Sequence, residues 1–216
     1  MLQFTLGRPN TPLRLLCFGA HGDDIETGCG GSLLRLLAEH PGSEVDWVVL
    51  SSTPERERET HASAADFLAD AERIRVTIEA FRESRFPWCG ESIKDVFEQV
   101  ETSASPDVVF THSRLDEHQD HRLIAELTWS TFRDHLVLEY EVPKYGGDLG
   151  QPNLFVPLPA AIAQRKIDLI LRHYQSLSRR SRFRSETLRA VLGLRGIECN
   201  AADGLAEAFH CRKATI

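Results

Sequence analysis

Apolar runs of strand length alternate with amphipathic stretches over the first two thirds of the chain. Each apolar run is bounded by turn residues and therefore predicts a β-strand. The strands expected from such runs span residues 13–19, 45–50, 108–111 and 136–140, and the alternating residues 73–78 predict a further short strand. The stretches between them predict helices at residues 28–40, 55–68, 93–103 and 118–132. Such alternation is typical of an α/β fold, in which a mostly parallel sheet carries helices on both faces.

The remaining residues follow a different pattern. Residues 143–159 contain four of the ten prolines of the chain and predict a long ordered loop, a segment that often forms a lid or a substrate wall. Residues 160–174 predict a further helix. The Ser/Arg-rich residues 178–184 predict a solvated connection more than an anion-binding segment. No linker composition interrupts the chain, so we expect residues 1–216 to form a single domain.

Composition and charge narrow the range of partners. The 216 residues are 42% hydrophobic, and the formal net charge of −7 disfavours nucleic acid and anionic membranes as main partners. No apolar stretch approaches the ~20 residues of a membrane-spanning helix, and the N-terminal residues do not resemble an export signal. The five cysteines form no C-x-x-C pair, which favours reduced thiols in a cytoplasmic protein. An oligomer is compatible with all of this.

Two short clusters of metal-type ligands carry most of the functional information. One covers residues 21–24, directly after the first predicted strand, and the other covers residues 116–121, directly after the fourth. Because open α/β sheets bind ligands beyond the carboxyl ends of their strands, we expect the clusters to meet although about 95 residues separate them. Together the two clusters supply three histidines and, besides Glu117, four carboxylates: His21, Asp23, Asp24, Asp116, His118, Asp120 and His121.

A mixed set of histidines and carboxylates suits zinc or another borderline divalent ion. His21 and Asp24 are three residues apart, as are His118 and His121, so each pair can converge on one face of a turn or helix. An open zinc site usually has three protein ligands, and the surplus groups could then supply acid and base. The residue types alone leave open which histidines and which aspartate bind. A structural metal site and ordinary surface turns are the alternatives at this point.

The same motifs carry a resemblance to a known family. The sequence AHGDD at residues 20–24, followed by glycines at residues 30–31, and DEHQDHR at residues 116–122 resemble the paired motifs of the PIG-L/LmbE-like zinc-dependent N-deacetylases. Supporting similarity extends over nearly the whole chain, at residues 56–59, 106–109, 153–156, 166 and 206–209. The resemblance implies a Rossmann-like fold and removal of acetyl groups from N-acetylglucosamine-type substrates. By position, His21, Asp24 and His121 resemble the zinc ligands of the family.

The resemblance also implies catalytic roles. Asp23 resembles the general base that activates water. His118 resembles the residue that stabilises the oxyanion and helps to protonate the leaving amine, and Asp120 resembles the partner that orients His118. A carboxylate beside His118 would raise the pKa of that imidazole above its unperturbed ~6.5, while a metal ion would lower it. One departure is Gly22, where the family usually has proline, and glycine loosens this turn.

Candidate substrate contacts lie outside the motifs. Arg56, at the start of the second predicted helix, and Tyr145, in the long loop, are the two that we select, and Lys144 and Asp148 share that loop. His112 directly follows the fourth predicted strand, where it either supports the site or simply packs.

Together these observations predict a cytoplasmic hydrolase with one Zn²⁺ per chain, which removes the acetyl group from an N-acetylated amino sugar or its conjugate and leaves a free amine. Two alternatives remain. One is a metallohydrolase that acts on another amide or on a phosphoester, for which two metal ions would be typical. The other is a non-catalytic, metal-dependent sugar-binding module, which would not need a base such as Asp23.

Overall fold

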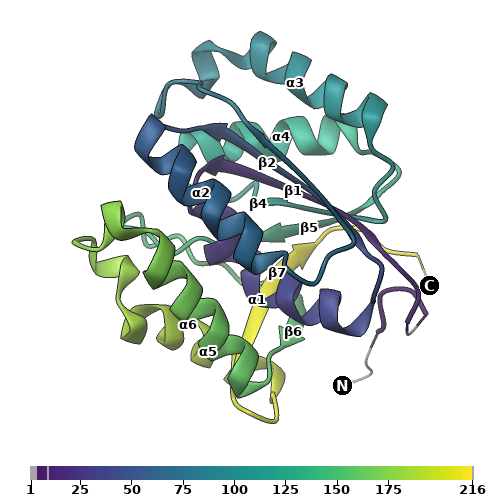
Figure 1. Ribbon diagram of the computed structural model, residues 1–216, viewed down its shortest axis with the longest axis vertical. Helices are drawn as coiled ribbons and strands as arrows, with labels where there is room; N and C mark the ends of the chain where they lie inside the picture. The colour runs from purple at the N-terminus through teal and green to yellow at the C-terminus, as the bar shows by residue number, and fades with distance from the viewer. Residues whose placement is uncertain (1–3, 9, 216) are drawn as a thin grey trace.

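A seven-stranded sheet lies between two layers of helices in the computed structural model, which describes residues 4–8 and 10–215 (Figure 1). The strands are β1 (Arg14–His21), β2 (Glu44–Ser51), β3 (Arg73–Ile78), β4 (Val108–His112), β5 (Leu136–Tyr140), β6 (Leu154–Pro157) and β7 (Ala206–Cys211). The α-helices are α1 (Asp24–Glu39), α2 (Pro54–Phe67), α3 (Gly90–Ser103), α4 (Gln119–Thr131), α5 (Ala160–His173) and α6 (Ser185–Cys199). Short 3-10 turns are η1 (Phe86–Trp88), η2 (Gln175–Leu177) and η3 (Ser181–Phe183). Within these described residues, no helix is long and apolar enough to cross a membrane.

The strand order across the sheet is β3-β2-β1-β4-β5-β7-β6. Strands β1 to β5 run parallel, whereas β7 is antiparallel to both β5 and β6. The chain first extends the sheet on one side of β1 and then, from β4 onward, on the other side. The carboxyl ends of β1 and β4 are therefore neighbours at the point where open α/β sheets bind their ligands.

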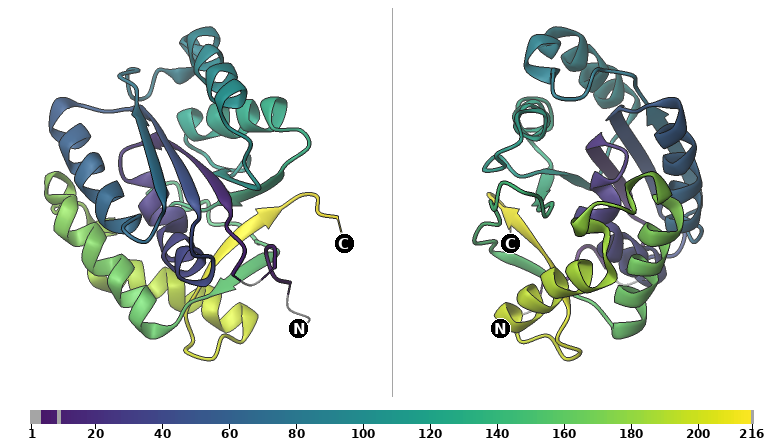
Figure 2. Two further views of the ribbon diagram at one scale, coloured as in Figure 1. Left: turned by 45° about the vertical axis from the view of Figure 1, so that its right-hand side comes forward. Right: turned by 90° about the vertical axis from the view of Figure 1, so that its left-hand side faces the viewer.

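Alternating side chains of β1 explain why helices cover both faces of the sheet. Leu15 and Cys17 belong to the apolar core shared with α1, α2, α5 and α6, while Leu16 and Phe18 belong to the core shared with α3 and α4. The ring of Phe18 stacks on Phe97 of α3 with 4.2 Å between ring centroids. Figures 1 and 2 show the two helical layers on opposite sides of the sheet. The predicted α/β fold with a mostly parallel sheet is confirmed.

Three elements of the last third, β6, α6 and β7, were not predicted from the sequence pattern. The expectation of a loop throughout residues 143–159 is wrong for Leu154–Pro157, which forms β6. This short strand lies at the edge of the sheet beside β7, a position where proline is tolerated. Helix α1 was predicted to begin at residue 28, but it begins at Asp24. The glycine-rich residues that suggested a turn lie inside this helix.

Side chains from α5 and β7 bond to backbone groups in the interior of helix α1. Glu207 of β7 accepts hydrogen bonds from the backbone N–H groups of Gly31 (2.8 Å) and Ser32 (2.6 Å). Lys166 of α5 donates to the backbone carbonyl of Thr27 at 2.6 Å. In most helices such groups bond only within the helix itself. Lys166 and Glu207 also pair with each other at 2.6 Å, and both side chains are buried.

The close approach of Glu207 requires a glycine in α1. A Cβ atom at Gly31 would lie 2.9 Å from Glu207 Oε1 and 2.5 Å from Leu158 Cδ1. The helix that begins with Asp24 is therefore fixed to the far end of the chain by a buried ion pair, which we call the α1 clamp (Lys166 and Glu207).

Candidate metal centre

The two ligand clusters meet at the carboxyl ends of β1 and β4. His21 is the last residue of β1, Asp24 opens α1, and His121 lies in the first turn of α4. His21 Nδ1 and His121 Nε2 are 3.3 Å apart although 100 residues separate them in the sequence. The expectation that the sheet brings the clusters together is confirmed.

Three ligand atoms converge at this point. Asp24 Oδ2 lies 3.2 Å from His21 Nδ1 and 3.5 Å from His121 Nε2, and all three side chains are buried. A tetrahedral zinc ion with ligand distances of about 2.0–2.2 Å keeps its ligand atoms about 3.3–3.6 Å apart. The three atoms thus have the spacing of one face of a zinc tetrahedron. His118 and His112 complete two overlapping groups of possible ligands, one with His21 and His121 and the other with Asp24 and His121.

A carboxylate contacts the far nitrogen of each of the two convergent histidines. Asp116 Oδ2 lies 2.9 Å from His121 Nδ1, and Asp120 Oδ2 lies 3.2 Å from His21 Nε2. Such contacts keep the proton on the far nitrogen and leave the near nitrogen able to bind a metal ion. The sequence placed Asp116 in the second cluster but did not identify it as the partner of His121.

The position of Asp120 corrects one expectation. Its carboxylate contacts His21 rather than His118, and it also accepts hydrogen bonds from the backbone N–H groups of Ser84 (2.6 Å) and Phe86 (3.1 Å). The bond between Asp120 and His118 runs the other way, because the backbone N–H of Asp120 donates to His118 Nδ1 at 3.2 Å. His118 is the N-cap residue of α4, so its ring is used to satisfy a free N–H of the first helical turn.

The buried cluster attracts positive charge. Burial disfavours a charged imidazole, but the carboxylates of Asp24 and Asp120 outweigh it and raise the pKa of His21 to about 10. Burial alone would raise the pKa of Asp24, yet the imidazoles of His121, His112 and His21 hold that pKa well below its usual range. A site that stabilises added protons in this way is suited to a divalent cation, which competes with protons for the same atoms.

His112 lies beside the three convergent ligand atoms. Its Nε2 accepts a hydrogen bond from the backbone N–H of Ala20 at 2.9 Å and lies 3.3 Å from Asp24 Oδ2, and its ring stacks on His121. Burial and the neighbouring His121 lower the pKa of His112 to about 4, so this imidazole is neutral at pH 7. Of the two roles that the sequence left open, this position favours support of the site over simple packing.

His118 is half-buried, whereas His21, His112 and His121 are buried. Burial and the neighbouring His21 lower the pKa of His118, although Asp120 acts in the opposite direction. The carboxylate of Asp120 thus acts in the expected direction, but burial and His21 outweigh it. A neutral His118 whose Nδ1 accepts the bond from Asp120 carries its proton on Nε2, so it can still donate a hydrogen bond.

Both carboxylate oxygens of Asp23 contact arginines. Arg56 of α2 donates to Oδ1, and Arg182 of η3 donates to Oδ2 at 2.8 Å. Asp23 is the N-cap residue of α1, but its side chain makes no capping bond and is free to meet both guanidinium groups. The interpretation of residues 178–184 as a solvated connection is wrong for Arg182. Arg56 holds Asp23, and its contact with a substrate stays a prediction.

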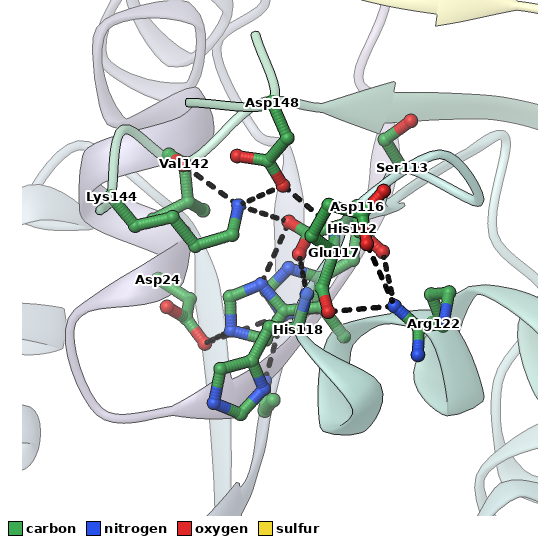
Figure 3. A network of polar contacts seen from close by, with 12 residues as sticks. Asp24, His112, Ser113, Asp116, Glu117, His118, Arg122, Val142, Lys144 and Asp148 are labelled. Carbon is green, nitrogen blue, oxygen red and sulfur yellow. Dashed lines mark hydrogen bonds and ion pairs between the residues drawn. The ribbon is translucent and has the colours of Figure 1, made fainter. Parts of the chain in front are cut away.

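The loop after β5 is tied to the second cluster through Lys144. Its ammonium group lies between two carboxylates, 2.7 Å from Asp116 Oδ2 and 2.8 Å from Asp148 Oδ2 (Figure 3). Asp148 also accepts a hydrogen bond from the backbone N–H of Glu117 at 2.7 Å. Lys144 and Asp148 therefore organise the site rather than project into solvent. Tyr145 is 86% exposed, and its predicted contact with a substrate stays a prediction.

The structure explains the glycine at position 22. A Cβ atom there would lie 2.4 Å from Thr60 Oγ1, and Thr60 donates a hydrogen bond to the carbonyl of Gly22 at 3.3 Å. Thr60 of α2 thus occupies the space that a proline ring would need. A glycine by itself would make the turn that carries Asp23 and Asp24 flexible. The contact of this turn with α2 restrains it instead.

These observations define an α/β protein with a candidate metal centre at the switch point of its sheet. The family model described as PIG-L: GlcNAc-PI de-N-acetylase matches residues 16–132, more than half of the 216 residues. The chain belongs to this PIG-L family. No curated protein sequence gives a significant match.

Several solved structures share the fold at low sequence identity. A conserved protein from Thermus thermophilus has a TM-score of 0.74 at 20% identity, over 94% of this chain and 96% of that one. N,N′-diacetylchitobiose deacetylase from Pyrococcus horikoshii has a TM-score of 0.70 at 18% identity, over 91% and 82%. GalB, a 4-carboxy-2-hydroxymuconate hydratase from Pseudomonas putida, has a TM-score of 0.72 at 17% identity, over 94% and 98%. This fold occurs both in a deacetylase and in a hydratase, so the fold alone does not determine which reaction a protein catalyses. The reaction has to be inferred from the residues of the site.

Proposed function

We propose that the protein is a zinc-dependent N-deacetylase that hydrolyses an N-acetylated amino sugar or its conjugate to acetate and a free amine. The observation that carries the proposal is the convergence of His21 Nδ1, Asp24 Oδ2 and His121 Nε2 at the separations of a zinc tetrahedron. Membership of a family described by de-N-acetylation supports the same reaction.

The donor set fits one zinc ion. His21, Asp24 and His121 would hold it, while Asp120 and Asp116 would orient the two histidines from their far nitrogens. When bound there, zinc would supply a Lewis acid that polarises a carbonyl group and makes water more acidic. His112 would stay outside the ligand set, because its Nε2 already accepts the bond from Ala20.

The remaining polar side chains match the proton transfers of amide hydrolysis. The oxygen of water bonds to the acetyl carbon and the C–N bond breaks, so one proton must leave the water and one must reach the amine nitrogen. Asp23 would accept the first proton, and its two guanidinium partners hold the carboxylate in position. His118 would donate a hydrogen bond from Nε2 to the developing oxyanion. The proton that Asp23 accepts would then be returned to the amine nitrogen as the C–N bond breaks.

The direct test measures free amine released from N-acetylated sugars by protein stripped of metal and then reloaded. We expect activity to disappear on stripping and to return with about one zinc ion per chain. Two metal ions per chain together with phosphoester hydrolysis would instead favour a two-metal phosphatase. Sugar binding that needs the metal but releases no amine would favour a non-catalytic module.

The substitution Lys144→Met is expected to weaken zinc binding by roughly 10- to 100-fold, the usual cost of losing an outer partner of a metal ligand. Without the ammonium group, the carboxylates of Asp116 and Asp148 repel each other, and Asp116 no longer holds His121 in place. Affinity is measured by competition with a chelator of known zinc affinity. Lys94→Met, on the surface of α3, is the matched control. Equal affinities in both variants would exclude a role for Lys144 in orienting the site.

A further inference from the structure

Residues 178–184 carry four arginines and no acidic residue, in a chain whose net charge is −7. Arg179, Arg180 and Arg184 are exposed and form no ion pair within the described part of the chain. Arg182 differs, because its side chain is only 18% exposed and reaches the buried Asp23. Local positive charge of this kind, against the overall sign of the protein, attracts anionic ligands.

Arg182 lies over the aromatic ring of its neighbour in the sequence. Its guanidinium group lies 5.0 Å from the centre of the ring of Phe183, which is buried in the core next to Tyr174. A cation over an aromatic face is held in a defined orientation. The connection between α5 and α6 therefore delivers one arginine to the site and leaves its neighbours in solvent.

The two arginines at Asp23 have more donors than this carboxylate uses. Within the described residues, the guanidinium group of Arg182 donates hydrogen bonds through Nη2 alone. A guanidinium group has five N–H donors in total. Arg56 has one further acidic neighbour, Glu83, which is half exposed and 4.0 Å away. The two guanidinium groups therefore keep unused donors beside the proposed base, and Nε of Arg56 is buried without a hydrogen-bond partner among the described residues.

We propose that Arg182, assisted by Arg56, is a specificity residue that binds an anionic oxygen group on the substrate. This inference rests on the proposed function: the substrate is then an N-acetylated sugar that carries a carboxylate or phosphate group. Arg182 keeps one N–H on Asp23 and offers the others to the anion, because the planar fork of arginine suits both types of group. Because Arg182 contacts both Asp23 and the anionic group, it also positions the acetamide group of the substrate relative to the proposed base.

The test compares three substrates that differ in charge. N-acetylglucosamine is neutral, N-acetylglucosamine 6-phosphate carries a phosphate group, and N-acetylmuramic acid carries a carboxylate. We expect the wild-type protein to prefer at least one anionic sugar in kcat/KM, and the preferred sugar identifies the anion. Arg182→Gln removes a partner of Asp23 for every substrate, but it removes the anion contact for the anionic sugar alone. The loss of kcat/KM for the anionic sugar should therefore exceed the loss for the neutral sugar by roughly tenfold or more, and this additional loss should fall mainly on KM. Arg182→Lys should restore part of the loss, and Arg180→Gln, an equal change of charge on the exposed part of the segment, should have little effect.

Binding of the amine products separates this inference from the proposed reaction. Calorimetry should show that glucosamine 6-phosphate or muramic acid binds more tightly than glucosamine, and that Arg182→Gln removes the difference. Release of no amine from any substrate would refute the deacetylase, while the binding difference would still support the anion site. An equal loss of kcat/KM for neutral and anionic sugars in Arg182→Gln, or a wild-type protein without preference for either anion, would overturn the inference and leave Arg182 as a support for Asp23.

Discussion

The variant Asp23→Asn is expected to keep its metal ion but to lose about 10²-fold or more in turnover, the scale at which a general base contributes. The amide has nearly the same shape as the carboxylate, but its single oxygen can keep the hydrogen bond from only one of the two arginines, Arg56 or Arg182. It cannot take a proton from water, so the loss should fall on kcat rather than on the binding of substrate. Rates are measured on protein whose zinc content and thermal unfolding have been checked first.

The matched control is Asp70→Asn, which removes one exposed carboxylate that lies 3.6 Å from Arg165 of α5. It should leave turnover, zinc content and stability unchanged. Full turnover in zinc-loaded Asp23→Asn would remove Asp23 from the mechanism. Loss of zinc from this variant would instead make Asp23 a support of the neighbouring ligand Asp24.

The second large effect is expected at the α1 clamp. Lys166→Met should lower the free energy of unfolding by roughly 3–5 kcal/mol, because it leaves the buried carboxylate of Glu207 without its counter-ion. It also removes the hydrogen bond to the carbonyl of Thr27 in α1. Chemical denaturation followed by circular dichroism measures the change, and the double variant Lys166→Met with Glu207→Gln should recover part of it.

Arg165→Met is the control on the same helix, where an exposed cation pairs loosely with Asp70 at 3.6 Å. Exposed pairs contribute about 0–1 kcal/mol, so this variant should unfold almost like the wild-type protein. A similarly small effect of Lys166→Met would show that the clamp adds little to the stability of the fold.

Four of the first five strands could be predicted from the sequence because each contains a buried apolar run that ends in turn residues, and β3 could be predicted from its alternation of polar and apolar residues. Helix α6 has no comparable pattern, since Gly193 and Gly196 lie in its interior and Gly196 packs against the backbone of Gly204. Strand β6 was missed because proline and glycine surround a short edge strand, whose pairing with β7 depends on residues some 50 positions away. Long-range pairing of this kind leaves little trace in local composition.

The candidate site was predictable to a similar extent. The carboxyl-end rule for parallel strands brings His21 and His121 together, and the structure confirms their proximity. The resemblance to the family paired Asp120 with His118, and side-chain directions that could correct this pairing are not contained in the sequence pattern. The carboxylate of Asp120 contacts His21 instead. The role of Arg182 was missed because the composition of an arginine-rich segment predicts exposure to solvent. Only the fold shows that one of these arginines, Arg182, contacts the buried Asp23.

The α1 clamp also has a consequence for the order in which the protein is assembled. Glu207 completes the hydrogen bonding of α1 from 176 positions further along the chain. During synthesis α1 leaves the ribosome long before β7, and closing so long a segment is entropically unfavourable and slow. Residues 16–132, which match the family model, contain both ligand clusters but neither residue of the clamp. The proposed ligand Asp24 opens α1, and this helix is fixed only when β7 docks. We therefore expect the proposed zinc ion to bind newly made chains only after that step, which would make metal uptake one of the last steps of maturation.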